Sequence, residues 1–387
     1  MKEFQKIIEN YEQITQQQAA LATVVNVEGS SYRRPGARML ITDDGKWTGA
    51  ISGGCLEGDA LRKARGVILS GKSRKITYNT MDDKGATSLS VGLGCNGIID
   101  VYLEPIDVKD LNNPVEMIKT FMQIKKPSVL GTIYSGEGIF QRLIGQRLMV
   151  DEHETLYETI TNLEIKERIL ADADELLRSN KSIAKIYQAN QDKLEVFFEY
   201  LQPEINLTIF GAGYDVNPVL ELAKNVGWQV MITEDCLAKV APSRFPMVDR
   251  LQYLDRAQIM EKLSFKDNSA VLIMSHNLNY DTEVLSQLFS YVEKTESIKY
   301  IGILGPGKRT EKMLNKIADR GILLNEGLLQ KIHSPVGLDI GAELPEEIAV
   351  SIIGEIKAVF TERNGGFLKE RTGFIHQRIQ NKHIEAI

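Results

Sequence analysis

A chain of 387 residues is longer than one hydrophobic core usually supports, so the length predicts at least two domains. With 43% hydrophobic and 25% charged residues, the composition excludes a disordered, collagen-like or fibrous protein. The net charge of -6 argues against a surface dedicated to nucleic acid or to anionic membranes, because such surfaces need clustered Lys and Arg. The charged, Gln-rich start has no apolar signal-peptide core and no apolar run approaches the roughly 20 residues that span a bilayer, so we expect a cytoplasmic protein.

The three cysteines, Cys55, Cys95 and Cys236, are isolated in the sequence. Their odd number argues against a disulfide scaffold, and the lack of a CxxC pair argues against a zinc site. Each cysteine is therefore either a small buried hydrophobic residue or a thiolate kept for ligand or metal chemistry.

The first 202 residues mix helical and strand patterns and are expected to form one α+β domain. Apolar spacing predicts a helix to about residue 20 and another over 57–69. Short β-rich runs predict strands at 21–27, 37–42, 75–78, 97–103, 129–134 and 194–200. The order of elements between residues 112 and 200 is left open.

Residues 203–387 are expected to form a Rossmann-like, doubly wound domain with a parallel sheet. A strand over 206–210 runs directly into Gly211-Ala212-Gly213, and a helix and further apolar strands follow. Continuous apolar runs are typical of strands covered on both faces. Pro345 opens a last long helix with Ile348, Ile352 and Ile356 on one face, and a polar tail follows from about residue 362.

The glycines at 211 and 213 stand where a Rossmann domain brings backbone amides and a helix N-terminus against a phosphate. Glu234 and Asp235 end the next strand, where a ribose hydroxyl is usually bound. Val216 replaces the third glycine of the dinucleotide motif, which weakens the case for ordinary NAD(P) binding. The alternative is a Rossmann domain that keeps the loop without the nucleotide.

Two further loops place a cysteine among glycines. In Ser52–Gly58 the amides of Gly53 and Gly54 precede a helix and could form an anion cradle, with Cys55 and Glu57 presented beside it. The alternative is a tight turn with Cys55 packed inside. A second loop, around Gly94 and Cys95, repeats the arrangement.

Polar residues follow two later strands of the second domain. His276 could bind a phosphate, act as an acid or base, or bind a metal, and Asp281 could orient it, although capping of the next helix is the stronger prediction for Asp281. Gly305 precedes Lys308 and Arg309, which suits an anionic ligand or a solvated turn. No nucleophile motif, HExxH or Walker A sequence occurs, so the sequence favours binding and transfer over catalysis.

Seven segments together resemble the xanthine dehydrogenase accessory proteins of the XdhC/CoxI type. They are EGSSYRRPGARMLI (28–41), GAISGGCLEGD (49–59), VGLGCNGIIDVYLEP (91–105), FGAGYDVNPV (210–219), SHNLNYD (275–281), GILGPGKR (302–309) and SPVGLDIGAELPEEIAVSI (334–352). Two departures stand out: Tyr214 and Asp215 follow the GxG where many relatives have His, and GCNG replaces GCGG at 94–97.

The resemblance implies a chaperone that binds molybdenum cofactor (molybdopterin) and delivers it to an apo molybdenum hydroxylase of the xanthine dehydrogenase type. It also implies contact with a cysteine-desulfurase-type sulfur donor, and we expect a homodimer. Molybdopterin is anionic, so amide cradles suit it, and Cys55 and Cys95 could approach its molybdenum end. The expected cofactor-binding residues are Gly53, Gly54, Cys55, Glu57, Gly94, Cys95, Gly211, Gly213, Asp235, His276, Asp281 and Gly305. The rival hypothesis is an NAD(P)-dependent oxidoreductase.

Overall fold

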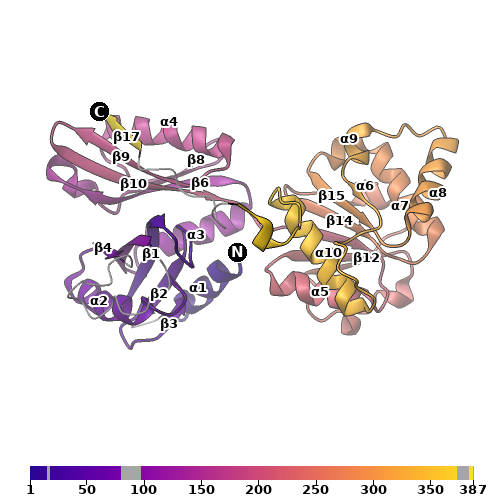
Figure 1. The fold of residues 1–387 in the computed structure, drawn as a ribbon, viewed down its shortest axis with the longest axis horizontal. Coiled ribbons are helices and arrows are strands. Elements are labelled where there is room, and N and C mark those ends of the chain that lie inside the picture. The colour runs from indigo at the N-terminus through magenta and orange to yellow at the C-terminus, as the bar shows by residue number, and fades with distance from the viewer. Residues whose placement is uncertain (15–17, 80–96, 373–382, 387) are drawn as a thin grey trace. The chain divides into compact units, whose positions relative to one another are not determined.

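The computed structural model describes residues 1–14, 18–79, 97–372 and 383–386, and the chain forms two compact units. The first unit is Met1–Gln202 together with Thr372–Ile387, and the second is Pro203–Arg371 (Figure 1). We expected the C-terminal residues to extend the second domain, but residues 372–387 group with the first unit. Strand β17 (His383–Ala386) pairs in parallel with β9 (Ile183–Ala189) of the first unit. No helix in the described part of the chain is long and apolar enough to cross a membrane.

The first unit contains two sheets rather than the one layer that a simple α+β domain would have. One is a five-stranded antiparallel sheet of order β3-β2-β1-β5-β4. Its strands are β1 (Ala19–Gly29), β2 (Arg38–Thr42), β3 (Trp47–Gly49), β4 (Arg74–Asn79) and β5 (Gly97–Ile106). Helix α2 (Glu57–Ser70) buries Ala60, Ala64 and Val67 against this sheet and is capped at its C-terminus by Gly71, whose φ of 64° is left-handed.

The second sheet of this unit has six strands in the order β17-β9-β10-β6-β7-β8. The remaining strands are β6 (Ser128–Gly136), β7 (Arg147–Val150), β8 (Thr155–Glu158) and β10 (Asp192–Leu201). Helix α4 (Leu163–Ser179) covers it, capped by Asn162 at its start. Helices α1 (Lys2–Glu12) and α3 (Pro114–Ile124) pack together, and a 3-10 turn spans Gly138–Leu143. Helix α1 is shorter than predicted, because strand β1 already begins at Ala19.

The two sheets of the first unit face one another across a layer that contains a small apolar cluster and buried ion pairs. Arg38 of β2 pairs with Glu199 of β10, and Arg147 of β7 pairs with Glu104 of β5. These four side chains are almost fully buried, as such pairs must be when they join two layers of a core. The sequence did not predict this division, because the segments between residues 112 and 200 carry weak apolar periodicity.

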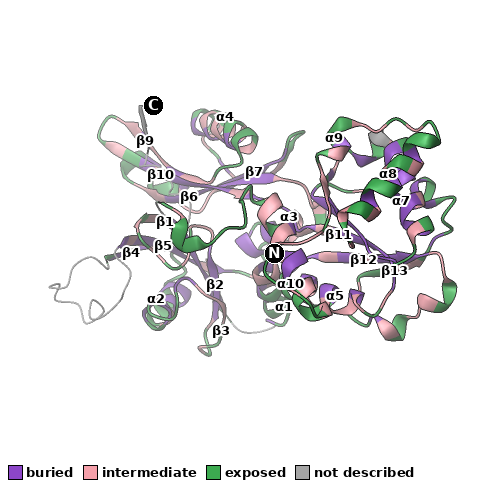
Figure 2. Ribbon diagram, turned by 45° about the vertical axis from the view of Figure 1, so that its right-hand side comes forward, coloured by how far each residue is buried: buried purple, intermediate pink, exposed green. Residues whose placement is uncertain are grey.

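The second unit confirms the predicted Rossmann-like architecture. All six strands are parallel and follow the order β13-β12-β11-β14-β15-β16, which is the 3-2-1-4-5-6 order of a Rossmann sheet. The strands are β11 (Asn206–Phe210), β12 (Gln229–Glu234), β13 (Arg250–Tyr253), β14 (Ser269–Ile273), β15 (Ile298–Ile303) and β16 (Ile332–His333). Figure 2 shows the central strands largely buried, as their mostly apolar sequences predict.

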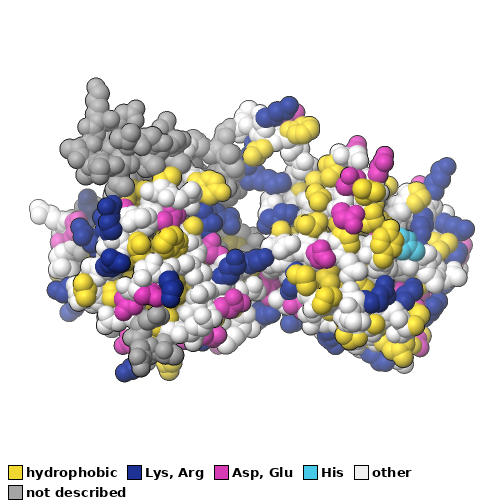
Figure 3. All heavy atoms as spheres, turned by 90° about the horizontal axis from the view of Figure 1, so that it is seen from below, with side chains coloured by type: hydrophobic (Ala, Val, Ile, Leu, Met, Phe, Trp, Pro, Cys, Tyr) yellow, Lys and Arg dark blue, Asp and Glu magenta, His cyan; other side chains and the backbone are white. Residues whose placement is uncertain are grey.

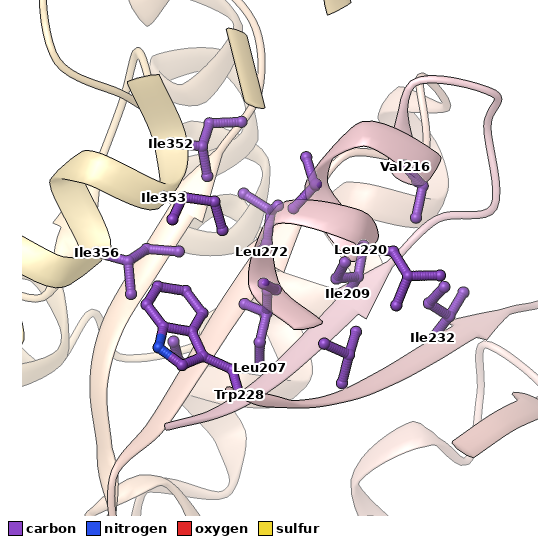
Figure 4. Close-up of a cluster of buried hydrophobic side chains, with 14 of the residues drawn as sticks. Leu207, Ile209, Val216, Leu220, Trp228, Ile232, Leu272, Ile352, Ile353 and Ile356 are labelled. Atoms are coloured by element: carbon purple, nitrogen blue, oxygen red, sulfur yellow. The ribbon is translucent and has the colours of Figure 1, made fainter. Parts of the chain in front are cut away.

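Helices cover both faces of this sheet. On one face lie α5 (Val216–Asn225) and α10 (Pro345–Phe360), and on the other lie α6 (Ile259–Lys262), α7 (Leu278–Ser290) and α8 (Gly307–Asp319). The predicted stripe of α10 is confirmed, because Ile352 and Ile356 are fully buried beside Trp228 (Figure 4) and Ile348 packs partly against the same cluster. Short elements complete the unit: α9 (Glu326–Leu329) and 3-10 turns at Leu237–Lys239, Pro242–Arg244, Val292–Thr295 and Leu368–Glu370.

Acidic and basic side chains are interspersed on the face of each unit seen in Figure 3.

Candidate functional site

The strand order places a crevice between β11 and β14, at the carboxyl edge of the second unit's sheet. Chain connections leave in opposite directions on either side of this point, and ligands of open α/β sheets bind at such a switch point. The loop after β11 contains Gly211, Ala212 and Gly213 and leads into α5. The loop after β14 contains Ser275, His276 and Asn277 and leads into α7.

Gly211 is the point where these two loops touch. Its φ is +131°, and a Cβ atom there would lie 2.6 Å from the carbonyl oxygen of Met274. Both the conformation and the close backbone neighbour exclude a side chain. This first glycine of the predicted motif is therefore required by the fold, whatever the ligand.

Gly213 has a different neighbour. A Cβ atom at this position would collide with Oδ1 of Asp215, so the Asp215 carboxylate occupies the space that the missing side chain leaves open. Oδ2 of Asp215 lies 2.8 Å from Nε2 of His276 across the crevice. Oδ1 of Asp215 is buried and has no hydrogen-bond partner among the described residues.

His276 joins the two loops from an unusual backbone conformation. Its φ is +60°, which is uncommon for a residue other than glycine and is often found at functional positions. The side chain is 61% exposed while its partner Asp215 is only 13% exposed. The imidazole therefore stands at the solvent side of the crevice and can contact a ligand there.

The acidic pair Glu234 and Asp235 at the end of β12 does not present two free carboxylates to a ribose. Glu234 is 2% exposed and accepts a hydrogen bond of 3.2 Å from the backbone N–H of Ala212. Burial and the adjacent carboxyl of Asp235 raise the pKa of Glu234, and Lys239 opposes this shift. Asp235 forms an ion pair with Arg256. Glu234 thus faces the glycine loop.

The prediction that Asp281 caps α7 is wrong, because Asn277 occupies that role. The side chain of Asn277 accepts hydrogen bonds from the backbone of Asn279 and Tyr280. Asp281 lies in the first turn, is fully buried, and accepts a hydrogen bond from Ser275 and one of 2.6 Å from Arg309. It does not orient His276.

Arg309 therefore acts as a link between two loops rather than as a free cation. It pairs with Asp281 and donates a 3.3 Å hydrogen bond to the carbonyl of Leu304, immediately before Gly305. Gly305 itself has a φ of +121°, and α8 begins two residues later. Lys308 remains exposed at this rim.

In the first unit, the loop before α2 is built around Glu57. The carboxylate of Glu57 accepts hydrogen bonds from the backbone of Ile51 (3.1 Å), Ser52 (2.7 Å) and Leu56 (3.2 Å), and from the Ser52 hydroxyl. Burial alone would raise the pKa of Glu57, but the hydrogen bonds from Ser52 and from the other amides outweigh it and lower the pKa. Glu57 thus turns inward and holds the loop closed, instead of standing beside an open cradle.

The tip of the same loop points to solvent. Gly53, Gly54 and Cys55 are all exposed, so the alternative in which Cys55 packs inside a tight turn is wrong. Cys236 is half-buried. The second glycine loop, with Gly94 and Cys95, lies outside the described residues. Within the described ranges, no three side chains of His, Cys, Asp and Glu converge so that they could hold a metal ion.

The sequence did not predict the contact between Asp215 and His276, the cap at Asn277 or the Asp281–Arg309 pair. Asn277 had a signal, since an Asn just before an apolar helical run is a common N-cap. Asp215 was noted only as a departure from related sequences. Nothing in the spacing indicated that its carboxylate would lie over Gly213.

Two segments of the chain match known protein families. Residues 207–356 match the XdhC Rossmann domain, which covers β11 through most of α10. Residues 14–79 match the XdhC and CoxI family, and this segment includes the Ser52–Cys55 loop.

Individual proteins are similar over nearly the whole chain. A Bacillus subtilis protein named as a probable xanthine dehydrogenase subunit is 30% identical over 88% of this chain and 93% of its own length. The molybdenum cofactor insertion chaperone PaoD of Escherichia coli is 24% identical over 88% of this chain and 83% of its own length. A crystal structure described as a xanthine dehydrogenase from Bacillus halodurans is 29% identical, with a TM-score of 0.70 over 95% of this chain and 98% of that one. From these matches, the chain belongs to the XdhC and CoxI family.

Proposed function

We propose that this protein binds molybdenum cofactor and delivers it to a molybdenum hydroxylase of the xanthine dehydrogenase type. The observation that carries the proposal is the likeness, over 88% of the chain, to a protein named as a molybdenum cofactor insertion chaperone. The name of the Bacillus subtilis relative supports a client of the xanthine dehydrogenase type.

The crevice of the second unit offers suitable contacts for the organic part of such a cargo. Molybdopterin carries a phosphate, and a glycine loop that leads into a helix N-terminus provides amides and a favourable dipole for it. Gly213 presents no side chain of its own to a ligand, although the Asp215 carboxylate lies beside it, and His276 stands at the solvent side of the same space. These features support binding of a phosphate-bearing ligand at this edge.

Cys55 supports a second contact, with the sulfur-ligated end of the cargo. Its thiol is exposed at the tip of a loop whose base is held by hydrogen bonds to Glu57, so the position is accessible. Soft sulfur ligands suit late and thiophilic metal centres. We assign the same role to Cys95, together with contact to a cysteine-desulfurase-type sulfur donor, on the sequence resemblance.

Co-elution tests this proposal directly. The purified full chain is mixed anaerobically with molybdenum cofactor and passed over a gel-filtration column, and molybdenum and pterin are measured in the protein peak. We expect stoichiometric co-elution and, on addition of an apo-hydroxylase of the xanthine dehydrogenase type, transfer with recovery of hydroxylase activity. A protein peak without pterin would refute the carrier function. Light scattering on the same column tests the expected homodimer.

The thiolate role is tested with Cys55→Ala and Cys95→Ala, with Cys236→Ala as the matched control. We expect each of the first two variants to lose cofactor several-fold faster than the wild type, while Cys236→Ala retains it normally. Thermal melting of Cys55→Ala should be unchanged, since Cys55 is exposed. Normal retention in both loop variants would remove the thiolate role and leave the carrier function standing.

An NAD(P)-dependent oxidoreductase is the second candidate, favoured by the 3-2-1-4-5-6 strand order and by Glu234 at the end of β12. The inward hydrogen bond of Glu234 to Ala212 and the Asp235–Arg256 ion pair count against a free ribose acceptor. Titration with NADH and NADPH, followed by nicotinamide fluorescence, separates the two candidates. Binding of NADH without retention of molybdenum cofactor would favour the oxidoreductase.

A further inference from the structure

The Asp215 carboxylate lies where a Rossmann domain normally receives a phosphate. In such domains the second glycine of the motif has no side chain so that the backbone can approach the ligand's phosphates. Gly213 is that second glycine, and Oδ1 of Asp215 lies within clashing distance of the Cβ position that it leaves empty. A phosphate oxygen and this carboxylate oxygen cannot occupy the same space.

The carboxylate is poorly held in this position. Asp215 is the N-cap residue of α5, yet its side chain makes no capping hydrogen bond to the helix. Oδ1 is buried with no partner among the described residues, an arrangement that costs free energy for a charged oxygen. Oδ2 has His276, whose side chain is 61% exposed. The neighbouring Tyr214 is 73% exposed, so solvent lies next to Asp215.

We propose that Asp215 is a displaceable occupant of the phosphate position in this crevice. A phosphate-bearing ligand moves the carboxylate away from Gly213 and takes over its contact with Nε2 of His276. Asp215 thereby lowers the affinity of the crevice for free phosphates, because a ligand must first displace a like charge. This inference rests on the proposed function only in that both put a phosphate-bearing ligand at the same loop.

The test measures binding of inorganic pyrophosphate to the full chain by isothermal titration calorimetry. Asp215→Asn keeps the size of the side chain and removes its charge, and Asp215→Ala removes the occupant altogether. We expect both variants to bind pyrophosphate about tenfold more tightly than the wild type. Asp319→Asn is the matched control, since it removes one exposed negative charge at the far end of α8 and should leave the affinity unchanged.

His276 provides the second arm of the experiment. In the Asp215→Asn background, His276→Gln should weaken pyrophosphate binding about fivefold, the effect of one lost hydrogen bond to a charged group. Thermal melting of every variant shows that the unit remains folded.

Wild-type affinity, weaker affinity, or no measurable pyrophosphate binding in both Asp215 variants would overturn the inference. These failures are distinguishable from failure of the proposed function. A protein that retains molybdenum cofactor but shows no gain on Asp215→Asn keeps its function and loses the inference. If Asp215→Asn binds pyrophosphate more tightly but the protein retains no molybdenum cofactor, the inference stands and the proposed function fails.

Discussion

The loop before α2 in the first unit and the loop before α5 in the second unit both contain glycines, but an acidic residue has a different environment in each. Each loop contains glycines and precedes a helix, and in each a nearby carboxylate is turned toward the loop. The Glu57 carboxylate accepts three hydrogen bonds from backbone N–H groups and one from the Ser52 hydroxyl. Asp215 has His276 on one oxygen and no described partner on the other.

This difference indicates which of the two carboxylates the folded structure needs. A buried carboxylate with every oxygen satisfied is costly to remove, because its loss leaves several amides without partners. A buried carboxylate with an unpartnered oxygen can be replaced by a better anion at little cost. Glu57 is therefore a fixed part of its loop, and Asp215 is the exchangeable one.

The largest expected effect is a difference in stability between substitutions at the two glycines of the second unit's loop. Gly211→Val should destabilise the second unit by about 4 kcal/mol, because it combines a left-handed backbone with a clash against the Met274 carbonyl. A Cβ at position 213 clashes with the movable Asp215 side chain and is in ordinary contact with Cδ2 of His276 at 3.6 Å, so Gly213→Val should change the stability by less than about 1 kcal/mol. Urea unfolding followed by fluorescence of the buried Trp228, in a Trp47→Phe background, measures both.

Ligand binding provides the check on this pair. Gly213→Val should abolish pyrophosphate binding although the unit stays folded, since its side chain enters the space in front of the loop. Equal stability losses in the two variants would show that Gly213 is as much a packing requirement as Gly211, and the distinction between them would fail.

A smaller effect tests the two carboxylates themselves. Glu57→Ala should lower the free energy of unfolding of the first unit by about 3 kcal/mol, since the amides of Ile51, Ser52 and Leu56 lose their acceptor in a buried loop. Asp215→Ala should change the stability of the second unit by less than about 1 kcal/mol. Urea unfolding followed by circular dichroism and by Trp228 fluorescence resolves the two units. A larger loss for Asp215→Ala would contradict the assignment of roles.

Much of the fold could be predicted because the strands of the second unit carry a clear signal. Asn206–Phe210 and its neighbours are mostly apolar, and glycine follows the first strand directly, so both strand positions and parallel pairing follow from the sequence. The two-sheet division of the first unit could not be predicted. It depends on buried pairs such as Arg38–Glu199, whose members lie 161 residues apart and resemble surface charges when read alone.

The sequence predicted which loops meet at the candidate site but not which side chains contact one another there. Gly211, Gly213 and His276 do lie at one switch point, because parallel strands bring their carboxyl ends to the same edge. Side-chain partners depend on rotamers and on tertiary neighbours. The sequence therefore could not show that Asp281 pairs with Arg309, that Asn277 caps α7, or that Glu57 turns inward.

The smallest expected effect is an acid dependence that belongs to Glu57. Its pKa is lowered in the folded protein, so the ionised carboxylate adds stability above its unfolded pKa of about 4.3, and this stability is lost as the pH falls through the folded value. Glu57→Gln lacks the charge at every pH. The difference in free energy of unfolding between wild type and Glu57→Gln should therefore be constant from pH 7 to about pH 5.5 and should shrink below that. If the difference stayed constant down to about pH 3, the shape of the side chain rather than its charge would hold the loop, and the contrast with Asp215 would rest on hydrogen-bond number alone.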